Sequence, residues 1–423
     1  MLLMFSLAMN RSRLEHTYEV YGASAEDVLE HIIGSGPTET STNILDLDKV
    51  VANVHHWRAT HPGLIPSYTP CANKNPLVLA VLAKLNVGFS CASRKEMNDL
   101  LDMGITADRM WLAHPSKTLD TILYAKQNGI LRIACDNVQD VAKVHRLYPA
   151  AQIVLRIRVS PEQKFGCCPA FDVPEIFNYA VSEKVNIVGV HIAIPQDQPE
   201  ESLAWLRQSL QEAEAAMAYA HQLGLGDLQQ LVLSGIEKIP QSRLRSTLKT
   251  ITVPVSFSII IETGRELVQN AVTLVTNVQS KRVIRQGELP SIIQEIMYFL
   301  NDGRYGSFEW WKAIDKPPSV RRMNETHRSQ IASWPSSLWG PTCDSADVIC
   351  ERLELPALEI GDFLIFSDMG AFGVTVASRF NGFPIPKTVA CARLESTRAM
   401  LGDNTLSVEL NQISQKVRAV CLK

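Results

Sequence analysis

The sequence lacks the patterns that mark several large classes of protein. It contains no CxxC pair, which argues against the common zinc modules, and no dense run of Lys or Arg that would form a nucleic-acid surface. The formal net charge of −3 also argues against a nucleic-acid surface. No apolar run approaches the length of a membrane span. We therefore expect no metal site, and neither nucleic acid nor a membrane among the partners.

Cysteine is sparse and irregularly placed, with nine residues scattered along 423. An odd number in a long chain argues against a disulfide framework, so most of these thiols are expected to be small buried residues in a reducing compartment. The first residues, "MLLMFSLAMNRSR", are briefly apolar, but the basic residues follow the apolar run. We interpret this stretch as a poorly ordered start or an edge element in preference to a secretory signal, and we expect a cytoplasmic protein.

From about residue 42, short apolar runs alternate with stretches of helical periodicity. The runs that read as strands are "LIPSYTP", "VGFSCAS", "RMWLAHP", "LRIACD", "AQIVLRIRV", "NIVGVHIAI", "LQQLVLSG" and "FSIIIETG". Between them, Ser93 and Glu96 have the spacing of a capping box, and Gly104 marks a helix end. Eight strands alternating with helices predict an α/β fold with a parallel (β/α)8 TIM-type barrel. A doubly wound open sheet is the alternative, but no GxGxxG follows the first strand.

In such a barrel, chemistry is located at the carboxyl ends of the strands. The residues predicted there are Cys71, Ser90, His114, Asp136, Arg156, His191, Gly235 and Glu262.

After residue 266 the pattern changes to alternating runs broken by Gly and Pro, which is typical of an antiparallel β-domain. Asn301-Asp302-Gly303 is a turn signal, and residues 316–330 are predicted to form an exposed loop. We therefore divide the chain into an N-terminal segment, residues 1–40, that packs on the β-domain, a barrel over residues 41–265, and the β-domain over residues 266–423.

These stretches together resemble the eukaryotic ornithine decarboxylase family over residues 40–390. The motifs that carry the resemblance, in order, are "VGFSCAS", "LRIACDN", "VLRI", "KFG", "IVGVH", "IETGR", "NDGRYGSF", "SSLWGPTCD" and "GDFLIFSDMGAFGV" with a later "FNGF". The resemblance implies the pyridoxal-phosphate fold of type III, an alanine-racemase-like barrel with a C-terminal β-domain. It also implies a pyridoxal phosphate cofactor, ornithine decarboxylation and a dimer whose site is built across two chains.

The sequence departs from this family at the covalent step. The first barrel strand of the family ends in a lysine that binds the cofactor as a Schiff base, and this chain has Cys71 there, in "YTPCAN". A thiol cannot form a stable imine with the cofactor. Lys74 is expected at the start of the following helix, where it could replace the missing amine only if the turn were rebuilt. Cys71 is also open to a simple interpretation as a small side chain that fills the position.

The predicted phosphate site departs as well. In the family, small residues and glycines after the sixth and seventh strands cradle the phosphate, whereas residues 191–195 read HIAIP and residues 235–237 read GIE. Pro195 donates no N–H, and Glu237 would bring a negative charge toward a phosphate. Phe372 replaces a tyrosine whose hydroxyl meets the phosphate in the family. Cofactor binding is therefore predicted to be lost or weak.

Other positions match the family's site residues. By resemblance, His191 stacks on the cofactor ring, Glu262 pairs with its nitrogen, Gly235 and Arg265 contact the phosphate, Asp302 and Asp344 meet the substrate, and Cys343 donates a proton across the dimer interface. Each has an alternative interpretation. His191 could be a satisfied histidine, Arg265 an ion-pair partner of Glu262, Asp302 a turn residue, and "WGPTCD" a segment of interface packing.

Several functions remain open. The first is a pseudoenzyme in polyamine metabolism that resembles the antizyme inhibitors, or a partner subunit that forms a homodimer, or a heterodimer with an ornithine decarboxylase, and supplies Cys343 and Asp344. The second is a divergent decarboxylase, a carbon-carbon lyase of polyamine or specialised-metabolite biosynthesis. The third is a binding protein for a small amine. Antizyme is one candidate partner, because the basic strip that binds it in the family retains Lys117 and Lys126 but has Leu123 in place of a lysine.

Overall fold

The computed structural model describes residues 18–195, 198–251, 257–286, 289–309, 318–321, 332–401 and 405–408. The predicted apolar start of the chain, residues 1–13, lies outside these ranges. Contacts divide the chain into two compact units. One unit comprises Val54–Pro70 and Leu82–Glu266, and the other comprises Met1–Asn53, Cys71–Val81 and Leu267–Lys423.

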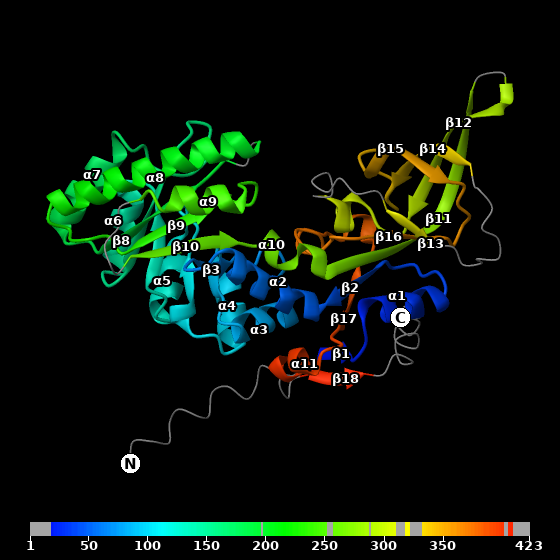
Figure 1. Ribbon diagram of the computed structural model, residues 1–423, viewed down its shortest axis with the longest axis horizontal. Helices are drawn as coiled ribbons and strands as arrows, with labels where there is room; N and C mark the ends of the chain where they lie inside the picture. Colours follow the sequence, from blue (N-terminus) through cyan, green and yellow to red (C-terminus); the bar gives the residue numbers. More distant parts are fainter. Residues whose placement is uncertain are drawn as a thin grey trace, which may run out of the picture. The chain divides into compact units, whose positions relative to one another are not determined.

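The first unit contains a closed parallel barrel with the strand order β10-β3-β4-β5-β6-β7-β8-β9 (Figure 1). The strands are β3 (Ile65–Tyr68), β4 (Gly88–Cys91), β5 (Met110–Leu112), β6 (Arg132–Cys135), β7 (Gln152–Ile157), β8 (Ile187–Ala193), β9 (Gln230–Ser234) and β10 (Ser258–Thr263). Each predicted barrel strand corresponds to one of them, so the predicted (β/α)8 barrel is confirmed. Pairing of Ile260 in β10 with Ile65 in β3 closes the ring.

Helices precede, connect and follow the barrel strands in the chain. They are α2 (Leu47–Thr60), α3 (Pro76–Lys84), α4 (Arg94–Asp102), η1 (Ala107–Arg109), α5 (Leu119–Gln127), α6 (Val138–Leu147), α7 (Asp172–Glu183), α8 (Pro199–Gln222), α9 (Gln241–Leu248) and α10 (Arg265–Val268). The Ser93 hydroxyl caps α4 by accepting from the backbone N–H of Glu96 at 3.2 Å. The Glu96 carboxylate accepts from Ala92 instead of Ser93, so only half of the predicted capping box forms there.

Part of the barrel interior is an apolar layer to which six strands, β5 to β10, each contribute one side chain. Its members are Trp111, Ala134, Val154, Val188, Val232 and Ile260. Layers of this kind fill parallel barrels with side chains and leave chemistry to the strand ends.

The second unit is built on a sheet with the order β15-β14-β12-β11-β2-β17-β1-β18, to which β16 and β13 add through β11. Its strands are β1 (Tyr18–Tyr21), β2 (Thr42–Asp46), β11 (Val272–Gln286), β12 (Leu289–Leu300), β13 (Ser319–Arg321), β14 (Ser333–Trp339), β15 (Val348–Pro356), β16 (Phe363–Phe366), β17 (Lys387–Cys391) and β18 (Thr405–Val408). Its short helical elements are α1 (Ala25–Gly34), η2 (Gln269–Ala271), η3 (Arg304–Phe308), η5 (Phe380–Gly382) and α11 (Glu395–Leu401).

The sheet is mostly antiparallel, as predicted for the β-domain, but it includes parallel pairs. β12 pairs in parallel with β14, and β17 pairs in parallel with both β1 and β2. Strands far apart in the chain can pair in either direction, because the connection between them is not a tight turn. Strand β2 lies within the range 41–265 that was predicted for the barrel, yet it pairs with β11 and β17 of this sheet.

Two predictions about the surface can be compared with the described residues. The exposed loop predicted at 316–330 is wrong at Ser319–Arg321, which forms β13 and pairs with β16. The other residues of that segment, apart from Pro318, lie outside the described ranges. No helix in those ranges combines the length and apolar character that a membrane span requires.

Candidate active site

The barrel strands bring a cluster of polar side chains together in the barrel interior. The side chains that we call the barrel cluster belong to Ser67, Ser90, Trp111, Arg156, His191 and Glu262. The Ser90 hydroxyl lies 2.7 Å from the Ser67 hydroxyl and accepts from the indole Nε1 of Trp111 at 2.8 Å. Because these are the inward-facing polar positions of their strands, the interior of this barrel is partly polar.

Glu262 and His191 are paired across the barrel. Glu262 Oε2 lies 3.2 Å from His191 Nε2, although β10 and β8 are not neighbouring strands. Burial raises the pKa of Glu262, but His191, the Ser90 hydroxyl and Arg156 together outweigh it and hold this pKa below its ordinary value. The Glu262 carboxylate is therefore ionised near neutral pH. His191 also packs edge-on against the Trp111 ring, at a centroid distance of 5.6 Å.

Three nitrogen or oxygen atoms of the barrel cluster have no hydrogen-bond partner among the described residues. They are Glu262 Oε1, His191 Nδ1 and Arg156 Nε. Glu262 Oε1 is buried and has no hydrogen-bond partner among the described residues, whereas Oε2 lies close to His191, which is 1% exposed. The cluster therefore keeps unused capacity to accept and to donate hydrogen bonds.

Cys71 lies in a loop that is fastened within the second unit. The neighbouring Ala72 carbonyl accepts from the backbone N–H of Phe372 at 2.8 Å, and the Asn73 side-chain amide donates to the Gly370 carbonyl at 2.9 Å. Cys71 and Lys74 are both exposed. Lys74 precedes α3 and directly follows Asn73, whose side chain is fastened by one of these bonds.

Asp302 is buried and its two carboxylate oxygens are already occupied. Oδ1 accepts from the backbone N–H groups of Gly303, at 2.8 Å, and Ser307, at 3.0 Å, while Oδ2 accepts from the Ser41 hydroxyl at 3.0 Å. Burial raises the pKa of Asp302 to about 6, against the opposing effect of these hydrogen bonds. This arrangement favours the interpretation of Asp302 as a turn residue over that of an amine-binding residue.

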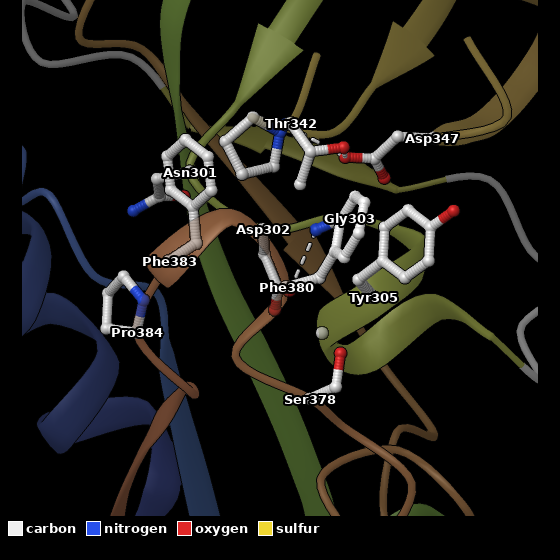
Figure 2. A pocket seen from close by; sticks show the side chains of 12 residues that line it. Asn301, Asp302, Gly303, Tyr305, Thr342, Asp347, Ser378, Phe380, Phe383 and Pro384 are labelled. Carbon is white, nitrogen blue, oxygen red and sulfur yellow. Dashed lines mark hydrogen bonds between the residues drawn. The ribbon is translucent and has the colours of Figure 1, made fainter. Parts of the chain in front are cut away.

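Figure 2 shows a cavity beside Asp302, lined by the aromatic rings of Tyr305, Phe380 and Phe383. Its volume is about 20 Å³. A volume of this size has room for about one water molecule.

Asp347 organises the loop that carries Cys343. Its buried carboxylate accepts from the backbone N–H of Arg304 at 2.7 Å, and from the backbone N–H and the hydroxyl of Thr342 at 3.0 and 2.7 Å. A Cβ at Gly303 or Gly340 would collide with this carboxylate, so both positions require glycine. We call residues 340–347, held by these bonds, the cysteine loop.

The cysteine loop presents Cys343 and Asp344 at the surface of the chain. Cys343 is exposed. The Asp344 carboxylate accepts from the Tyr305 hydroxyl and from the backbone N–H of Ala346, and these bonds lower the pKa of Asp344. The bond to Asp344 raises the pKa of Tyr305, whose ring packs 4.5 Å from Phe380. The chain thus holds these two residues in place without help from a second chain.

Lys117, which the sequence suggested as part of a basic partner-binding strip, is buried. Its ammonium donates to the carbonyl oxygens of Pro115, at 2.9 Å, and Ala134, at 2.6 Å, and forms an ion pair with Asp140. The prediction of an exposed lysine is therefore wrong at this position. Lys126 remains at the surface, where it donates to the Leu147 carbonyl at 3.0 Å.

The family of the chain follows from comparison with known proteins. The family model for the pyridoxal binding domain of pyridoxal-dependent decarboxylases matches residues 47–269. The chain belongs to the pyridoxal-dependent decarboxylases.

Its relatives include both decarboxylases and a regulator. The chain is 30% identical to an ornithine decarboxylase of Schizosaccharomyces pombe, with 88% of each chain covered. It is also 30% identical to antizyme inhibitor 2 of Xenopus laevis, with 86% of this chain and 84% of the relative covered. Among solved structures it is similar to a lysine/ornithine decarboxylase of Vibrio vulnificus in complex with putrescine, with a TM-score of 0.74, 25% identity and coverage of 87% and 98%.

The residues of this decarboxylase-family chain fit one end of pyridoxal phosphate and not the other. The ring end fits, because Glu262 Oε1 is a buried carboxylate oxygen without a donor. At the phosphate end, the Ile194 N–H is already bonded to the Ser234 carbonyl at 2.8 Å. A Cβ at Gly235 would collide with the Ile194 carbonyl oxygen, so the two loops pack directly on each other. Ile194 and Ile236 are 3% and 2% exposed.

Several of these residues were not identified from the sequence. Asp347, Tyr305 and Ser41 orient loops through bonds that join distant segments, and Trp111 enters the barrel cluster from a strand of three residues. One local signal could have pointed to Asp347. It ends the segment "GPTCDSAD", whose Gly, Pro, Asp and Ser predict a turn, and Asp side chains commonly accept hydrogen bonds from the backbone of turns. His114 and Asp136 were also predicted at the carboxyl ends of barrel strands, but they are not members of the barrel cluster. Arg265 begins α10 and is half-buried.

Proposed function

We propose that this chain is a decarboxylase-like protein that does not carry out normal pyridoxal-phosphate-dependent decarboxylation and acts as a partner subunit or regulator in polyamine metabolism. The observation that supports the proposal is a difference between two parts of the family's site: the positions that bind the cofactor depart from the family, whereas the cysteine loop does not. The covalent position holds Cys71 and the phosphate loops are filled by Ile194 and Ile236, whereas the cysteine loop is complete and presents Cys343.

The partner-subunit form of the proposal assigns the cysteine loop a specific task. In the family, this loop completes the site of the neighbouring chain, according to the resemblance. The loop in this chain is held by Asp347 and by the Tyr305–Asp344 hydrogen bond, and neither depends on a bound cofactor. The chain is therefore expected to complete the site of an active partner without having an active site of its own.

Mixed dimers test this task. An ornithine decarboxylase of the family, with its own cysteine at the position matching Cys343 changed to alanine, is co-expressed with this chain and assayed for CO2 release from ornithine. We expect activity to be restored, because each mixed dimer contains one site with both a Schiff-base lysine and Cys343. Cys343→Ala in this chain is the matched control and should abolish the rescue.

The oligomeric state gives a second readout. By sedimentation at about micromolar concentration we expect this chain to be a dimer, alone or mixed with the decarboxylase. Mixed dimers that form but show no rescue would contradict the assignment of Cys343. A chain that stays monomeric alone and in the mixture would contradict the partner-subunit proposal as a whole.

The regulator form of the proposal makes antizyme the partner, and the relative named antizyme inhibitor 2 supports it. The basic strip has two lysines, Lys117 and Lys126. Lys117 is buried in its ion pair with Asp140, so of these two only Lys126 lies at the surface. We therefore expect antizyme to bind this chain more weakly than it binds its inhibitor, and titration of both chains against antizyme measures the difference.

A divergent decarboxylase is the second candidate function, and one observation favours it. Glu262 is ionised and keeps one oxygen without a partner among the described residues, as a ring nitrogen would require. Purified protein with added pyridoxal phosphate, tested for CO2 release from ornithine and for borohydride-fixed label, separates the two candidates. Release of CO2 by the homogeneous chain favours the enzyme, whereas the absence of both release and label favours the partner subunit.

A further inference from the structure

Two of the thiols of the chain differ from the others in exposure. Of the eight cysteines that the structure describes, Cys71 and Cys343 are the exposed ones. Cys168 and Cys350 are partly buried, and Cys421 lies outside the described ranges. Burial raises the pKa of the remaining four, which are Cys91, Cys135, Cys167 and Cys391. Because the thiolate is the reactive form and a reagent must reach it, thiol chemistry is concentrated at the two exposed residues.

Both exposed thiols lie on loops of the same compact unit. The loop of Cys71 is fastened by hydrogen bonds to Gly370 and Phe372. The cysteine loop, which carries Cys343, is fastened by the Asp347 carboxylate. Each of these bonds lies within one chain. The two thiols are therefore held in place on this unit before any partner binds.

The proposed function brings the two thiols to the same place in a dimer of this chain. By the resemblance, the family's cysteine gives its proton to the carbon that loses carbon dioxide, and the lysine of the other chain is displaced and restored at the imine next to that carbon. The two family residues thus reach the same few atoms, and this chain has Cys343 and Cys71 at their positions. Dimers of identical chains are commonly two-fold symmetric, so one such contact is repeated in reverse.

We infer that Cys343 of each chain in the homodimer pairs with the partner's Cys71, and that a small disulfide such as oxidised glutathione joins the two thiols in an interchain disulfide. This inference rests on the proposed function, because it requires the cysteine loop to enter the site of the neighbouring chain. The Cys343 thiolate attacks the small disulfide and releases one reduced thiol, and the thiolate of the partner's Cys71 then displaces the second. Two protein thiols are oxidised, and one small disulfide is reduced to two thiols.

The disulfide acts as a switch on the proposed activity. Sulfur held in a disulfide has no proton to donate, and chains linked as a homodimer do not exchange into mixed dimers. Oxidation therefore withdraws Cys343 from an active decarboxylase. In a reducing compartment the bond is transient, so reduction returns the cysteine loop to a partner.

Non-reducing gels of the full chain, after equilibration with oxidised glutathione, test the pairing. We expect the natural chain to shift from the position of one chain to that of two, and dithiothreitol to reverse the shift. Cys71→Ser and Cys343→Ser should each lose the linked band. A mixture of these two variants should regain it, because a mixed dimer of the two contains one thiol of each kind. Cys168→Ser, at a partly buried cysteine, is the matched control and should link as the natural chain does.

Three results would overturn the inference. A disulfide closes only when the two Cα atoms come within about 7 Å, so a dimer in sedimentation that stays unlinked shows that the two thiols do not meet. A linked band that persists in either single variant means that other thiols pair. A bond between Cys71 and Cys343 of one chain, identified by mass mapping of the monomer band, places the pair within the chain. Thermal unfolding of each variant shows whether a lost band comes from a loss of folded protein.

The outcomes also separate this inference from the proposal on which it rests. An unlinked dimer that rescues the partner decarboxylase removes the disulfide and leaves the partner-subunit proposal in place. A linked dimer that gives no rescue after reduction keeps the thiol pair and removes the assignment of Cys343 as a proton donor. A chain that stays monomeric contradicts both.

Discussion

Replacing Asp302 by asparagine removes a buried charge while retaining every hydrogen bond of the side chain. Both backbone N–H donors, from Gly303 and Ser307, meet the same carboxylate oxygen, Oδ1. The amide oxygen of an asparagine can accept both of them. The amide nitrogen then faces the Ser41 hydroxyl, which can rotate to become the acceptor. We therefore expect Asp302→Asn to fold as the natural chain does.

The magnitude follows from the pKa of Asp302. Burial raises it from 3.8 to about 6. Because the pKa of the folded state lies above that of the unfolded state, this group contributes stability below pH 3.8 that is lost as the pH rises through 6. Between about pH 4.5 and about pH 7.5 this loss lowers the free energy of unfolding by about 2 kcal/mol. Asparagine does not titrate, so the variant avoids that loss.

The assay is urea denaturation of both proteins at the two pH values, which cancels the titration of all other groups. The difference in free energy of unfolding, variant minus natural chain, should be larger at about pH 7.5 than at about pH 4.5 by about 2 kcal/mol. A difference that does not change with pH would refute the argument, because Asp302 would then have the same pKa in both states. A difference that falls with rising pH would show that the folded chain favours the ionised carboxylate.

Three further predictions concern single side chains. Asp347→Asn should lower the free energy of unfolding by about 1–3 kcal/mol in urea, because its two oxygens accept from different backbone N–H groups and either orientation of an amide opposes one of them. Asp140→Ala should lower it by about 3–5 kcal/mol by leaving the Lys117 ammonium buried, whereas Asp99→Ala, which breaks an exposed pair, should change it by less than about 1 kcal/mol. Cys71→Lys should not restore robust decarboxylation, since the loops after β8 and β9 also depart from the family; near-family CO2 release from that variant would show that those loops are competent.

The barrel could be predicted from the sequence because each of its strands is a local pattern. An apolar run followed by an amphipathic helix is recognisable within about 20 residues, and parallel barrel strands pair in chain order. Cys71 could be placed for the same reason, since it lies at the end of a recognisable strand. The features that could be predicted are therefore those that depend on residues close together in the sequence.

The pairing of β2 with β11 and β17 could not be predicted in this way. Thr42–Asp46 contains only two apolar residues, Ile44 and Leu45, and its partners lie more than 200 residues away. The burial of Lys117 was missed for a related reason, since its partner Asp140 belongs to α6 and not to the helix that follows Lys117. The role of Asp302 is a similar case, because Ser41 occupies one of its oxygens from a distant segment. The sequence shows which residues carry charge, but not which distant groups neutralise them.

The positions of isoleucine and glycine differ between the loops after β8 and β9 and the region of the cysteine loop. Ile194 and Ile236 are buried in the loops where the family binds phosphate, and burying such a side chain stabilises a fold by about 1.5–3 kcal/mol. The buried isoleucines of the loops after β8 and β9 are therefore what a gain in stability alone would favour. The cysteine loop and the turn that packs on it are different, since a Cβ at Gly340 or at Gly303 would collide with the Asp347 carboxylate. The Asp347 carboxylate that excludes a Cβ there also holds the loop of Cys343 and Asp344, which agrees with the proposal that the chain acts through these two residues.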